Sequence, residues 1–326
     1  MKKTYILSAI LFFAFININA QATDVVTGLM GPYGLLLNGS DLYIAENMAS
    51  KVSKIDVTAA TPVATDVLVI PDGPGGFALN GNDLYISDWG GKISKIDITA
   101  ATPVATDVVT GLDLPVAIKL VGNDLYVSQH MVGIISKIDV TAATPVAIDI
   151  LIGISGPAGY ALNGNDLYFA QTDANKISKI DITAATPTVT DVVAGLNAPW
   201  GLVLNGNILY ISEFFGNKVS RINITDTTPV ATDVVTGLMS PTELAIIGSD
   251  LYISENGAGK ISKVGITLSI EENILKNRIQ LYPNPATEYI QLSNLTASEG
   301  YTIYNLLGVK IKAATFLIMK KLMSRT

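Results

Sequence analysis

Short apolar stretches alternate with polar turns along residues 22–267, and the pattern repeats every 41 or 42 residues. Asp-Leu-Tyr begins the second apolar stretch of most repeats, and Ile208-Leu209-Tyr210 is the variant copy. A proline lies nine residues before each copy, and a Ser-Lys or Ser-Arg pair follows it. Repeats of this length are the signature of a modular fold, so they organise everything that follows. The five exact copies of Asp-Leu-Tyr begin at Asp41, Asp83, Asp124, Asp166 and Asp250.

Each repeat predicts four short β-strands. The first follows the proline and is apolar at consecutive positions, which is typical of a strand covered on both faces. Asn-Gly pairs then favour a tight hairpin, because glycine accepts positive φ and asparagine tolerates it. The second strand is Asp-Leu-Tyr-Ile-Ser, the third Lys-Ile-Ser-Lys-Ile-Asp, and the fourth Asp-Val-Val-Thr-Gly. The Ser-Lys pairs of the third strand recur in an outer strand of each repeat, and we expect them to form a solvated surface rather than a Ser-Lys dyad. No helical period persists in the repeats, so the predicted fold class is all-β.

Six copies of a four-stranded unit predict a six-bladed β-propeller. A closed ring covers every sheet face with a neighbour, which a single blade cannot do. The second residue after the proline is small in five copies, which suggests close backbone approach near the axis, whereas the sixth copy has Glu243. The repeats begin with a fourth-strand sequence at 22–28 and end with a third strand at 260–267. We therefore expect the N-terminal strand to close the last blade, which a solenoid, the main alternative, would not require.

The N-terminus has the pattern of a signal peptide over residues 1–20. Lys2 and Lys3 precede an apolar core at 6–16, and Ala20 offers a cleavage edge before Gln21. No apolar run reaches the length of a membrane span, so we expect no transmembrane segment. The predicted protein is exported to the cell surface or the medium. Its propeller covers 21–268, followed by a linker at 269–275 and a small C-terminal β-domain at 276–326.

Composition narrows the chemistry. Hydrophobic residues make up 49% of the chain and charged residues 15%, which indicates a globular protein. The chain has no cysteine, which excludes disulfides and thiolate chemistry. Its formal charge is −7, and losing Lys2 and Lys3 with the leader makes it −9. Such an acidic protein has no electrostatic footprint for nucleic acid.

The repeat Pro-x-Gly-Leu-x-Leu-Asn-Gly-x-x-Leu-Tyr-Ile-Ser-Glu resembles the NHL-type propeller repeat over residues 22–268. The blades are also similar to those of virginiamycin B lyases and, more distantly, of regucalcin-like gluconolactonases. The resemblance implies a propeller, histidine and glutamate near the axis in the lyases, and carboxylate and asparagine metal ligands in the lactonases. This chain has one histidine, His130, so a multi-histidine centre is excluded. The blade pattern itself serves unrelated functions.

Residues 274–311 resemble a type IX secretion C-terminal sorting domain. The resemblance rests on Leu281-Tyr282-Pro283-Asn284-Pro285-Ala286 and on Tyr304-Asn305-Leu306-Leu307-Gly308. It implies that the type IX machinery is a partner. From residue 313 the sequence turns apolar and then basic, unlike the family. Codons permitted for 314–326, read one base earlier, can spell a sorting-domain continuation. We therefore expect an incomplete domain ended by a frameshift near residue 313, with a divergent end as the alternative.

A polar side chain recurs five residues after each Asp-Leu-Tyr start. In propellers the loops before first strands and after second strands share one face, so these six side chains should ring one end of the central channel. An oxygen-rich ring suits a hard cation such as Ca²⁺. A recurring polar residue is also typical of a blade-building element that accepts backbone N–H bonds at a strand end, and we favour this interpretation. The metal candidates are Glu46, Asp88, Glu213 and Glu255, with Gln129 and Gln171 in the remaining blades.

Side chains that differ between blades at the same end are candidate ligand contacts. Exposed aromatic residues suit a peptide or sugar. A lone histidine is more often a surface residue than a catalyst, and tryptophans serve packing as well as binding. Lys119 and Glu243 interrupt otherwise apolar or small positions. The ligand candidates are Tyr33, Trp89, His130, Trp200, Phe214 and Glu243.

Two function classes fit these features. The first is a secreted or cell-surface propeller that recognises an extracellular protein, peptide or glycan without catalysis. The second is a metal-dependent enzyme of the lactonase or lyase kind, with its site at the acidic end of the channel. Near-identity between blades favours recognition, because an enzyme site needs unlike groups from different blades. The lack of a nucleophile motif and the single histidine favour it too.

Overall fold

The computed structural model describes residues 21–266, 280–282, 291–293, 299–304 and 310–316. The chain divides into two compact units, residues 1–266 and residues 267–326. Several sequence predictions lie outside the described residues: the signal peptide at 1–20, the linker at 269–275, the prolines at 283 and 285, and the end at 317–326.

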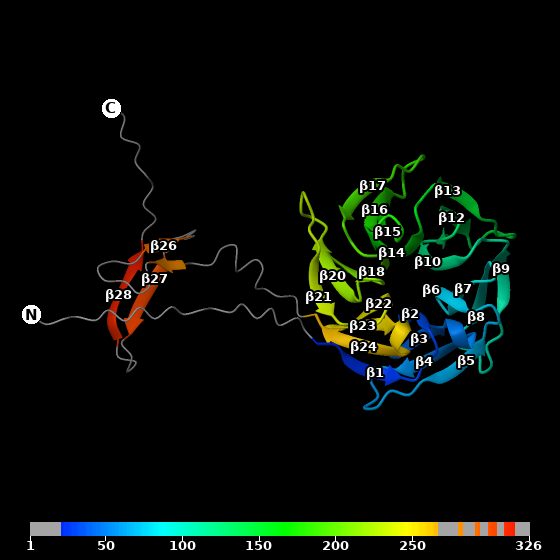
Figure 1. The fold of residues 1–326 in the computed structure, drawn as a ribbon, viewed down its shortest axis with the longest axis horizontal. Helices are drawn as coiled ribbons and strands as arrows, with labels where there is room; N and C mark the ends of the chain where they lie inside the picture. Colours follow the sequence, from blue (N-terminus) through cyan, green and yellow to red (C-terminus); the bar gives the residue numbers. More distant parts are fainter. Residues whose placement is uncertain (1–20, 267–279, 283–290, 294–298, 305–309, 317–326) are drawn as a thin grey trace, which may run out of the picture. The chain divides into compact units, whose positions relative to one another are not determined.

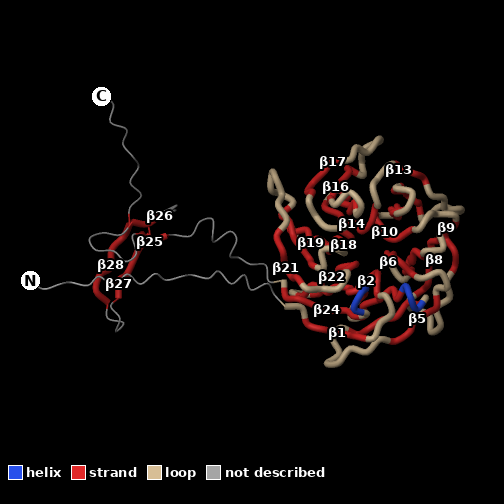
Figure 2. The backbone as a smooth tube through the Cα atoms, viewed as in Figure 1, coloured by secondary structure: helices blue, strands red, loops and turns tan. Residues whose placement is uncertain are grey.

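The first unit is a six-bladed β-propeller, as the repeat predicts (Figure 1). Each blade is a four-stranded antiparallel sheet whose first strand lies innermost and whose fourth lies outermost (Figures 1 and 2). Blade 1 consists of β2 (Pro32–Asn38), β3 (Asp41–Glu46), β4 (Lys51–Asp56) and β5 (Thr65–Val69). Blade 2 consists of β6 (Pro74–Asn80), β7 (Asp83–Asp88), β8 (Lys92–Asp97) and β9 (Thr106–Thr110).

The next three blades follow the same order. Blade 3 consists of β10 (Pro115–Val121), β11 (Asp124–Gln129), β12 (Ile134–Asp139) and β13 (Ile148–Ile152). Blade 4 consists of β14 (Pro157–Asn163), β15 (Asp166–Gln171), β16 (Lys176–Asp181) and β17 (Thr190–Ala194). Blade 5 consists of β18 (Pro199–Asn205), β19 (Ile208–Glu213), β20 (Lys218–Asn223) and β21 (Thr232–Thr236).

Blade 6 is assembled from both ends of the propeller sequence. Its inner strands are β22 (Pro241–Ile247), β23 (Asp250–Glu255) and β24 (Lys260–Gly265), and its outer strand is β1 (Thr23–Thr27). In this sheet Thr27 pairs with Lys260 and Thr23 with Lys263. The predicted closure by the N-terminal strand is confirmed. Two short 3₁₀ helices, η1 (Asn47–Ala49) and η2 (Asn256–Ala258), follow the second strands of blades 1 and 6.

The inner strands approach one another as closely as the small residues after each proline indicate. A Cβ atom on Gly34 would collide with the carbonyl oxygen of Gly75 in the next blade, and one on Gly201 with that of Thr242. The second strands supply the core between blades, and their Leu and Tyr side chains are buried in all six copies. Close packing of this kind makes the position of each first strand depend on its neighbours.

The prediction that the Ser-Lys pairs of the third strands form a solvated surface is wrong. The third strand lies between the second and fourth strands of its sheet, so a neighbouring blade covers its faces. The serines are therefore buried, whereas the lysines reach the sheet margin and pair with aspartates, as Lys54 does with Asp41 at 2.6 Å. The buried serines are Ser53, Ser94, Ser136, Ser178, Ser220 and Ser262.

The described residues of the second unit form two small antiparallel sheets. One pairs β25 (Gln280–Tyr282) with β26 (Gln291–Ser293), and the other pairs β27 (Glu299–Tyr304) with β28 (Lys310–Phe316). Nowhere in the described ranges does a helix have the length and hydropathy needed to span a membrane.

Candidate functional site: the aromatic end of the propeller axis

The loop end of the propeller is the end at which first strands begin and second strands finish. The recurring polar residue is the last residue of each second strand, and it is buried in all six blades. In blade 1 the Glu46 carboxylate accepts a hydrogen bond from the Met30 backbone N–H at 2.9 Å, and in blade 5 Glu213 accepts one from Asn197 at 2.8 Å. Each side chain thus fixes the loop that leads into its own blade.

The same bond recurs across the ring with a spacing of sixteen residues. Glu255 accepts from the Met239 N–H at 3.0 Å, and Gln129 accepts from the Asp113 N–H at 2.8 Å. The glutamate carboxylates and the glutamine amide oxygen therefore accept the same backbone hydrogen bond. The second oxygen of each glutamate faces the first lysine of the third strand, as Glu46 faces Lys51 at 3.5 Å.

The four carboxylates that were candidates for a metal site have hydrogen-bond or ion-pair partners in their own blades. Each is engaged within its own blade, and the described residues contain no group of three or more His, Asp or Glu side chains that could hold an ion. Asp88 differs because its side chain is shorter and its loop lacks one residue. It accepts from the Lys92 N–H at 3.2 Å, and burial raises the pKa of its carboxyl group. The geometry of Glu46, Asp88, Glu213 and Glu255 is that of a blade-building element.

The next residue along the chain joins neighbouring blades in four of six copies. Its backbone N–H bonds to the loop before the first strand in every blade. The side chain then donates to the carbonyl of the proline that begins the next blade: Asn47 to Pro74 at 3.2 Å, Thr172 to Pro199 at 2.8 Å. The other two bonds run from His130 Nδ1 to Pro157 at 3.0 Å and from Asn256 to Pro32 at 3.3 Å.

Trp89 in blade 2 and Phe214 in blade 5 occupy this same position without that bond. Their backbones match the other copies, since Trp89 N–H donates to Gly73 and Phe214 N–H to Ala198. Two blades have therefore exchanged an inter-blade hydrogen bond for an aromatic ring. The backbone frame is unchanged, so the exchange alters what the loop end presents rather than how it is built.

These rings form a continuous aromatic cluster, defined by Tyr33, Trp89, His130, Trp200, Phe214 and Phe215. Tyr33 lies edge-to-face with Trp89 and with Trp200, each at 5.4 Å between ring centroids. His130 packs against Trp200 at 5.0 Å, and Phe214 lies 6.1 Å from Trp200. Edge-to-face rings at such distances attract one another beyond their burial. The structure thus brings together five of the six candidate ligand residues.

The cluster reaches across the loop end of the axis. Tyr33, His130 and Trp200 belong to blades 1, 3 and 5, so their ring contacts run across the centre from alternate blades. Tyr33 is buried among them, and burial raises the pKa of its hydroxyl, with Glu243 acting in the same direction. Trp89 remains 39% exposed at the outer margin of the cluster.

His130 takes part in both the framework and the cluster. Its Nδ1 must carry the hydrogen to donate to the Pro157 carbonyl, which leaves Nε2 as the acceptor of the neutral ring. Its ring meanwhile lies against Trp200. It therefore positions the cluster, and any ligand contact it makes is through Nε2.

Glu243 and Lys119 lie behind the cluster on the first strands of opposite blades. The Glu243 carboxylate lies beside Gly201 of blade 5, and its charge acts on Tyr33 of blade 1. Burial raises the pKa of Glu243 to about 7, and the Lys119 ammonium opposes that rise. Among the described residues Lys119 has no ion pair within 4.0 Å, so the two charges are coupled without contact. Both side chains keep partial exposure.

The loops around the cluster expose further apolar side chains that sequence reasoning missed. Phe215 is 70% exposed and packs against Phe214 at 5.1 Å. Two sequence features could have predicted these exposed side chains. One is the Phe-Phe pair after β19, and the other is the methionine present in four loops of the loop end. The exposed charged residues of these loops are acidic: Asp72, Asp113 and Asp173. The exposed methionines are Met30, Met48, Met131 and Met239.

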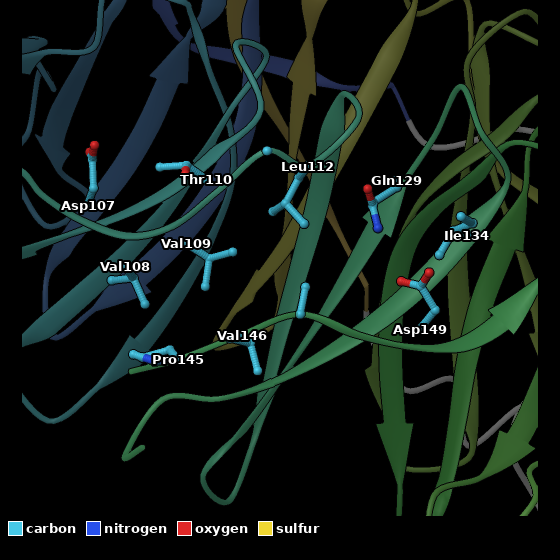
Figure 3. Close-up of a pocket in the computed structure, with 12 residues that line it drawn as sticks. Asp107, Val108, Val109, Thr110, Leu112, Gln129, Ile134, Pro145, Val146 and Asp149 are labelled. Carbon is cyan, nitrogen blue, oxygen red and sulfur yellow. The ribbon is translucent and has the colours of Figure 1, made fainter. Parts of the chain in front are cut away.

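Cavities of the propeller also occur between blades, away from the axis. One of about 660 Å³ lies between the outer strand of blade 2 and blade 3 (Figure 3). A second of about 510 Å³ occupies the equivalent place between blades 6 and 1. Because these grooves repeat with the blades, they follow from the architecture. They differ in that Glu46 and Lys51 line the second, where Gln129 and Ile134 line the first.

No family model and no curated protein matches the chain. Solved structures do. Virginiamycin B lyase from Staphylococcus aureus superposes with a TM-score of 0.57 at 16% identity, over 76% of this chain and 99% of that one. A luciferin-regenerating enzyme gives 0.65 at 13% identity, over 77% and 96%. A chain of a nidogen/laminin complex gives 0.57 at 18% identity, over 67% and 86%.

These likenesses confirm the propeller fold and nothing finer. The neighbours include enzymes and a chain from a protein complex, so the fold alone does not select a function. The choice depends on the loop end of this chain.

Proposed function

We propose that this chain is an exported recognition propeller that binds a protein or peptide through the aromatic cluster at its loop end. The observation that carries the proposal is the exchange of inter-blade hydrogen bonds for Trp89 and Phe214 on an unchanged backbone. Framework needs explain the asparagine, threonine and histidine at this position. They do not explain the two aromatic residues.

The chemistry of the surrounding loops favours a polypeptide partner. Tryptophan, phenylalanine and methionine are enriched at protein interfaces, and tryptophan is among the residues that carry most of the binding free energy there. Methionine adapts its shape to irregular surfaces. The exposed acids Asp72, Asp113 and Asp173 add a preference for lysine or arginine. The proposed ligand is therefore a segment with apolar and basic side chains.

Export and surface placement are part of the proposal. They rest on the signal-peptide pattern at 1–20 and on the resemblance of 274–311 to a type IX sorting domain. An extracellular site is consistent with a partner in the medium or on a neighbouring cell.

Intrinsic fluorescence tests the proposal directly, because the only two tryptophans of the chain are Trp89 and Trp200. Titrating the full chain with a peptide library of mixed aromatic and basic composition should change this emission saturably. Trp89→Ala should weaken binding of the selected peptide at least tenfold. The control Val104→Ala, also exposed but in the turn before β9 and outside the loop end, should leave affinity unchanged.

Equal loss of affinity in both variants, or saturable binding of oligosaccharides but no peptide, would overturn the proposal. The glycan outcome would keep the site and change the ligand class.

One observation favours an enzyme as the second candidate. Burial raises the pKa of Glu243 to about 7 and the Lys119 ammonium opposes that rise, and a carboxyl group with a pKa near neutrality suits a general acid or base. A panel of lactones and cyclic esters, with and without divalent cations, separates the candidates. Turnover abolished by Glu243→Gln would favour the enzyme.

A further inference from the structure

All four methionines between residues 21 and 266 lie at the loop end of the propeller. Met30 and Met239 belong to the loops before β2 and β22, and Met48 and Met131 follow β3 and β11. Their side chains are 55% to 73% exposed. The buried hydrophobic residues of the described propeller are leucine, isoleucine, valine, alanine, phenylalanine and tyrosine. The described core therefore contains no thioether, and the loop end contains four.

The framework does not require methionine at these positions. The second residue before the proline is Met30 in blade 1 and Met239 in blade 6, but aspartate, serine or asparagine elsewhere. The backbone N–H donates the same bond whatever the side chain, as Met30 does to Glu46 at 2.9 Å and Asn197 to Glu213 at 2.8 Å. The second residue after the second strand is methionine in blades 1 and 3, and glycine, aspartate or phenylalanine elsewhere. Their side chains can therefore change chemically while the backbone bonds persist.

Three of the four methionines belong to blades 6 and 1, which are neighbours in the ring. Met48 packs over the backbone next to Met30, because a Cβ atom on Gly31 would lie 2.7 Å from its Cγ and 3.2 Å from its Sδ. Met131 directly follows His130 of the aromatic cluster in sequence. The thioethers therefore belong to the same loops that carry the aromatic cluster.

Exposed thioethers react with peroxides. The sulfur lone pair attacks one peroxide oxygen, a sulfur–oxygen bond forms and the oxygen–oxygen bond breaks. The departing hydroxide takes up the remaining proton and leaves as water, so the sulfur is oxidised and the peroxide reduced. The product, methionine sulfoxide, is polar where the thioether was apolar. The chain has no cysteine, so methionine holds all of its sulfur.

We propose that Met30, Met48, Met131 and Met239 form an oxidant-sensitive modification site, at which peroxide converts the thioethers to sulfoxides on the folded propeller and lowers the affinity of the loop end for its ligand. The effect on affinity rests on the proposed function, whereas the modification itself does not. A sulfoxide oxygen bonds to water, and covering it with an apolar ligand side chain breaks that bond at a cost in free energy. The propeller itself stays folded, because no methionine belongs to its described core.

Treating the full chain with dilute hydrogen peroxide tests this inference. Mass spectrometry of proteolytic peptides should show one added oxygen atom on each of the four methionines, while the melting temperature stays unchanged. The affinity for the peptide selected from the aromatic and basic library should fall at least about tenfold, as expected when apolar contacts are lost. Methionine sulfoxide reductases should restore it, which separates thioether oxidation from damage to the two tryptophans.

Two variants are the controls, each compared with its own untreated form. The variant with leucine in place of all four methionines should show no effect of peroxide, whereas Met319→Leu, Met323→Leu, which changes only the C-terminal methionines, should respond as the native chain does. Thioethers that resist oxidation in the folded chain, a melting temperature that falls on oxidation, or an unchanged affinity of the oxidised chain would each overturn the inference.

A failure of the proposed function gives a different result, in which the untreated chain binds no peptide. The apolar dye bis-ANS then provides the readout, because it reports exposed apolar surface without a natural ligand. Its fluorescence with the native chain should fall on oxidation and recover with the reductases, and it should not change in the variant with four leucines. Dye binding that oxidation leaves unaltered would overturn the inference as well.

Discussion

The second strands of the blades are nearly identical in all copies, whereas the side chains at the loop end differ from blade to blade. Second strands are nearly identical in all six copies, and their Leu and Tyr side chains are buried in each. At the loop end the backbone bonds are equally constant, but the side chain after each second strand changes from asparagine to tryptophan, histidine, threonine and phenylalanine. The constant second-strand residues hold the ring together, whereas the varying residues determine which side chains the loop end presents. The comparison predicts that changes to the first region cost stability, whereas changes to the second cost binding.

Removing a whole framework strand should have the largest effect. Deleting residues 22–28 takes β1 from blade 6 and exposes the edge of β24, so ladder bonds and packing vanish together. We expect the free energy of unfolding to fall by at least about 4 kcal/mol. Urea denaturation followed by circular dichroism measures it. Thr23→Ala, which keeps the strand, should stay close to the native chain. An unchanged midpoint after the deletion would show that β1 does not hold the ring closed.

A single methyl group at the inner strands should have the next largest effect. Gly201→Ala places a Cβ against the Thr242 carbonyl, and the backbone must shift to admit it. We expect a loss of about 2 kcal/mol, as for overpacked interiors. Gly265→Ala, whose Cβ would meet only Asp250 at 4.0 Å, is the control and should be neutral. Equal stability of the two variants would contradict the close approach of the inner strands.

The carboxyl group of Glu243, on an inner strand behind the aromatic cluster, should make the stability of the propeller depend on pH. Burial raises its pKa from 4.5 to about 7, so the folded chain holds a proton that the unfolded chain releases. Its contribution to stability is therefore complete below pH 4.5 and declines as the pH rises to about 7. Glu243→Gln should match the native chain at pH 4 and exceed it at pH 8 by on the order of 2 kcal/mol. Thermal unfolding across this pH range provides the measurement.

Lys119→Met is the companion variant for this titration. It removes the cation that opposes the rise, so the pKa of Glu243 should move further upward and the loss of stability should extend to higher pH. A pH profile unaffected by either substitution would mean that the two charges do not face each other.

The smallest change in stability should come from the loop end itself. Trp89→Asn gives blade 2 the residue that bonds to the next blade in blades 1 and 6. A new hydrogen bond worth about 1 kcal/mol should offset the lost contact with Tyr33. Stability should change by less than about 1 kcal/mol while peptide binding falls. Loss of stability like that of Gly201→Ala would make Trp89 part of the framework.

The fold could be predicted from sequence because the same repeat of 41 or 42 residues occurs six times and predicts the same four strands each time. The Asp-Leu-Tyr and proline spacings give the strands, and the unmatched fourth-strand sequence at 22–28 gives the closure, which the structure confirms. The serines of the third strands were misjudged because alternation does not reveal which strand of a blade lies inside the sheet. A serine such as Ser53 is polar in sequence and buried in the blade.

The site was harder to predict, because its contacts join blades that are distant in sequence. The position of Trp89 in its repeat indicates the loop end, but nothing local shows that it meets Tyr33, or that Tyr33 meets Trp200. The oxygen ring was predicted from the same positions, with two interpretations. Only the hydrogen bond sixteen residues back, as from Met30 to Glu46, shows the structural role of these side chains.

The two-part construction of blade 6 has a consequence for the order in which the protein folds. Blades 1 to 5 each use one continuous stretch of chain, so their strands can pair as soon as that stretch is available. Strand β1 is synthesised before all of them, yet its partner Lys260 comes more than two hundred residues later. Pairing across such a separation is slow, since a long loop must close first. We therefore expect ring closure to be the last and rate-limiting event, so that the first strand made is the last one placed.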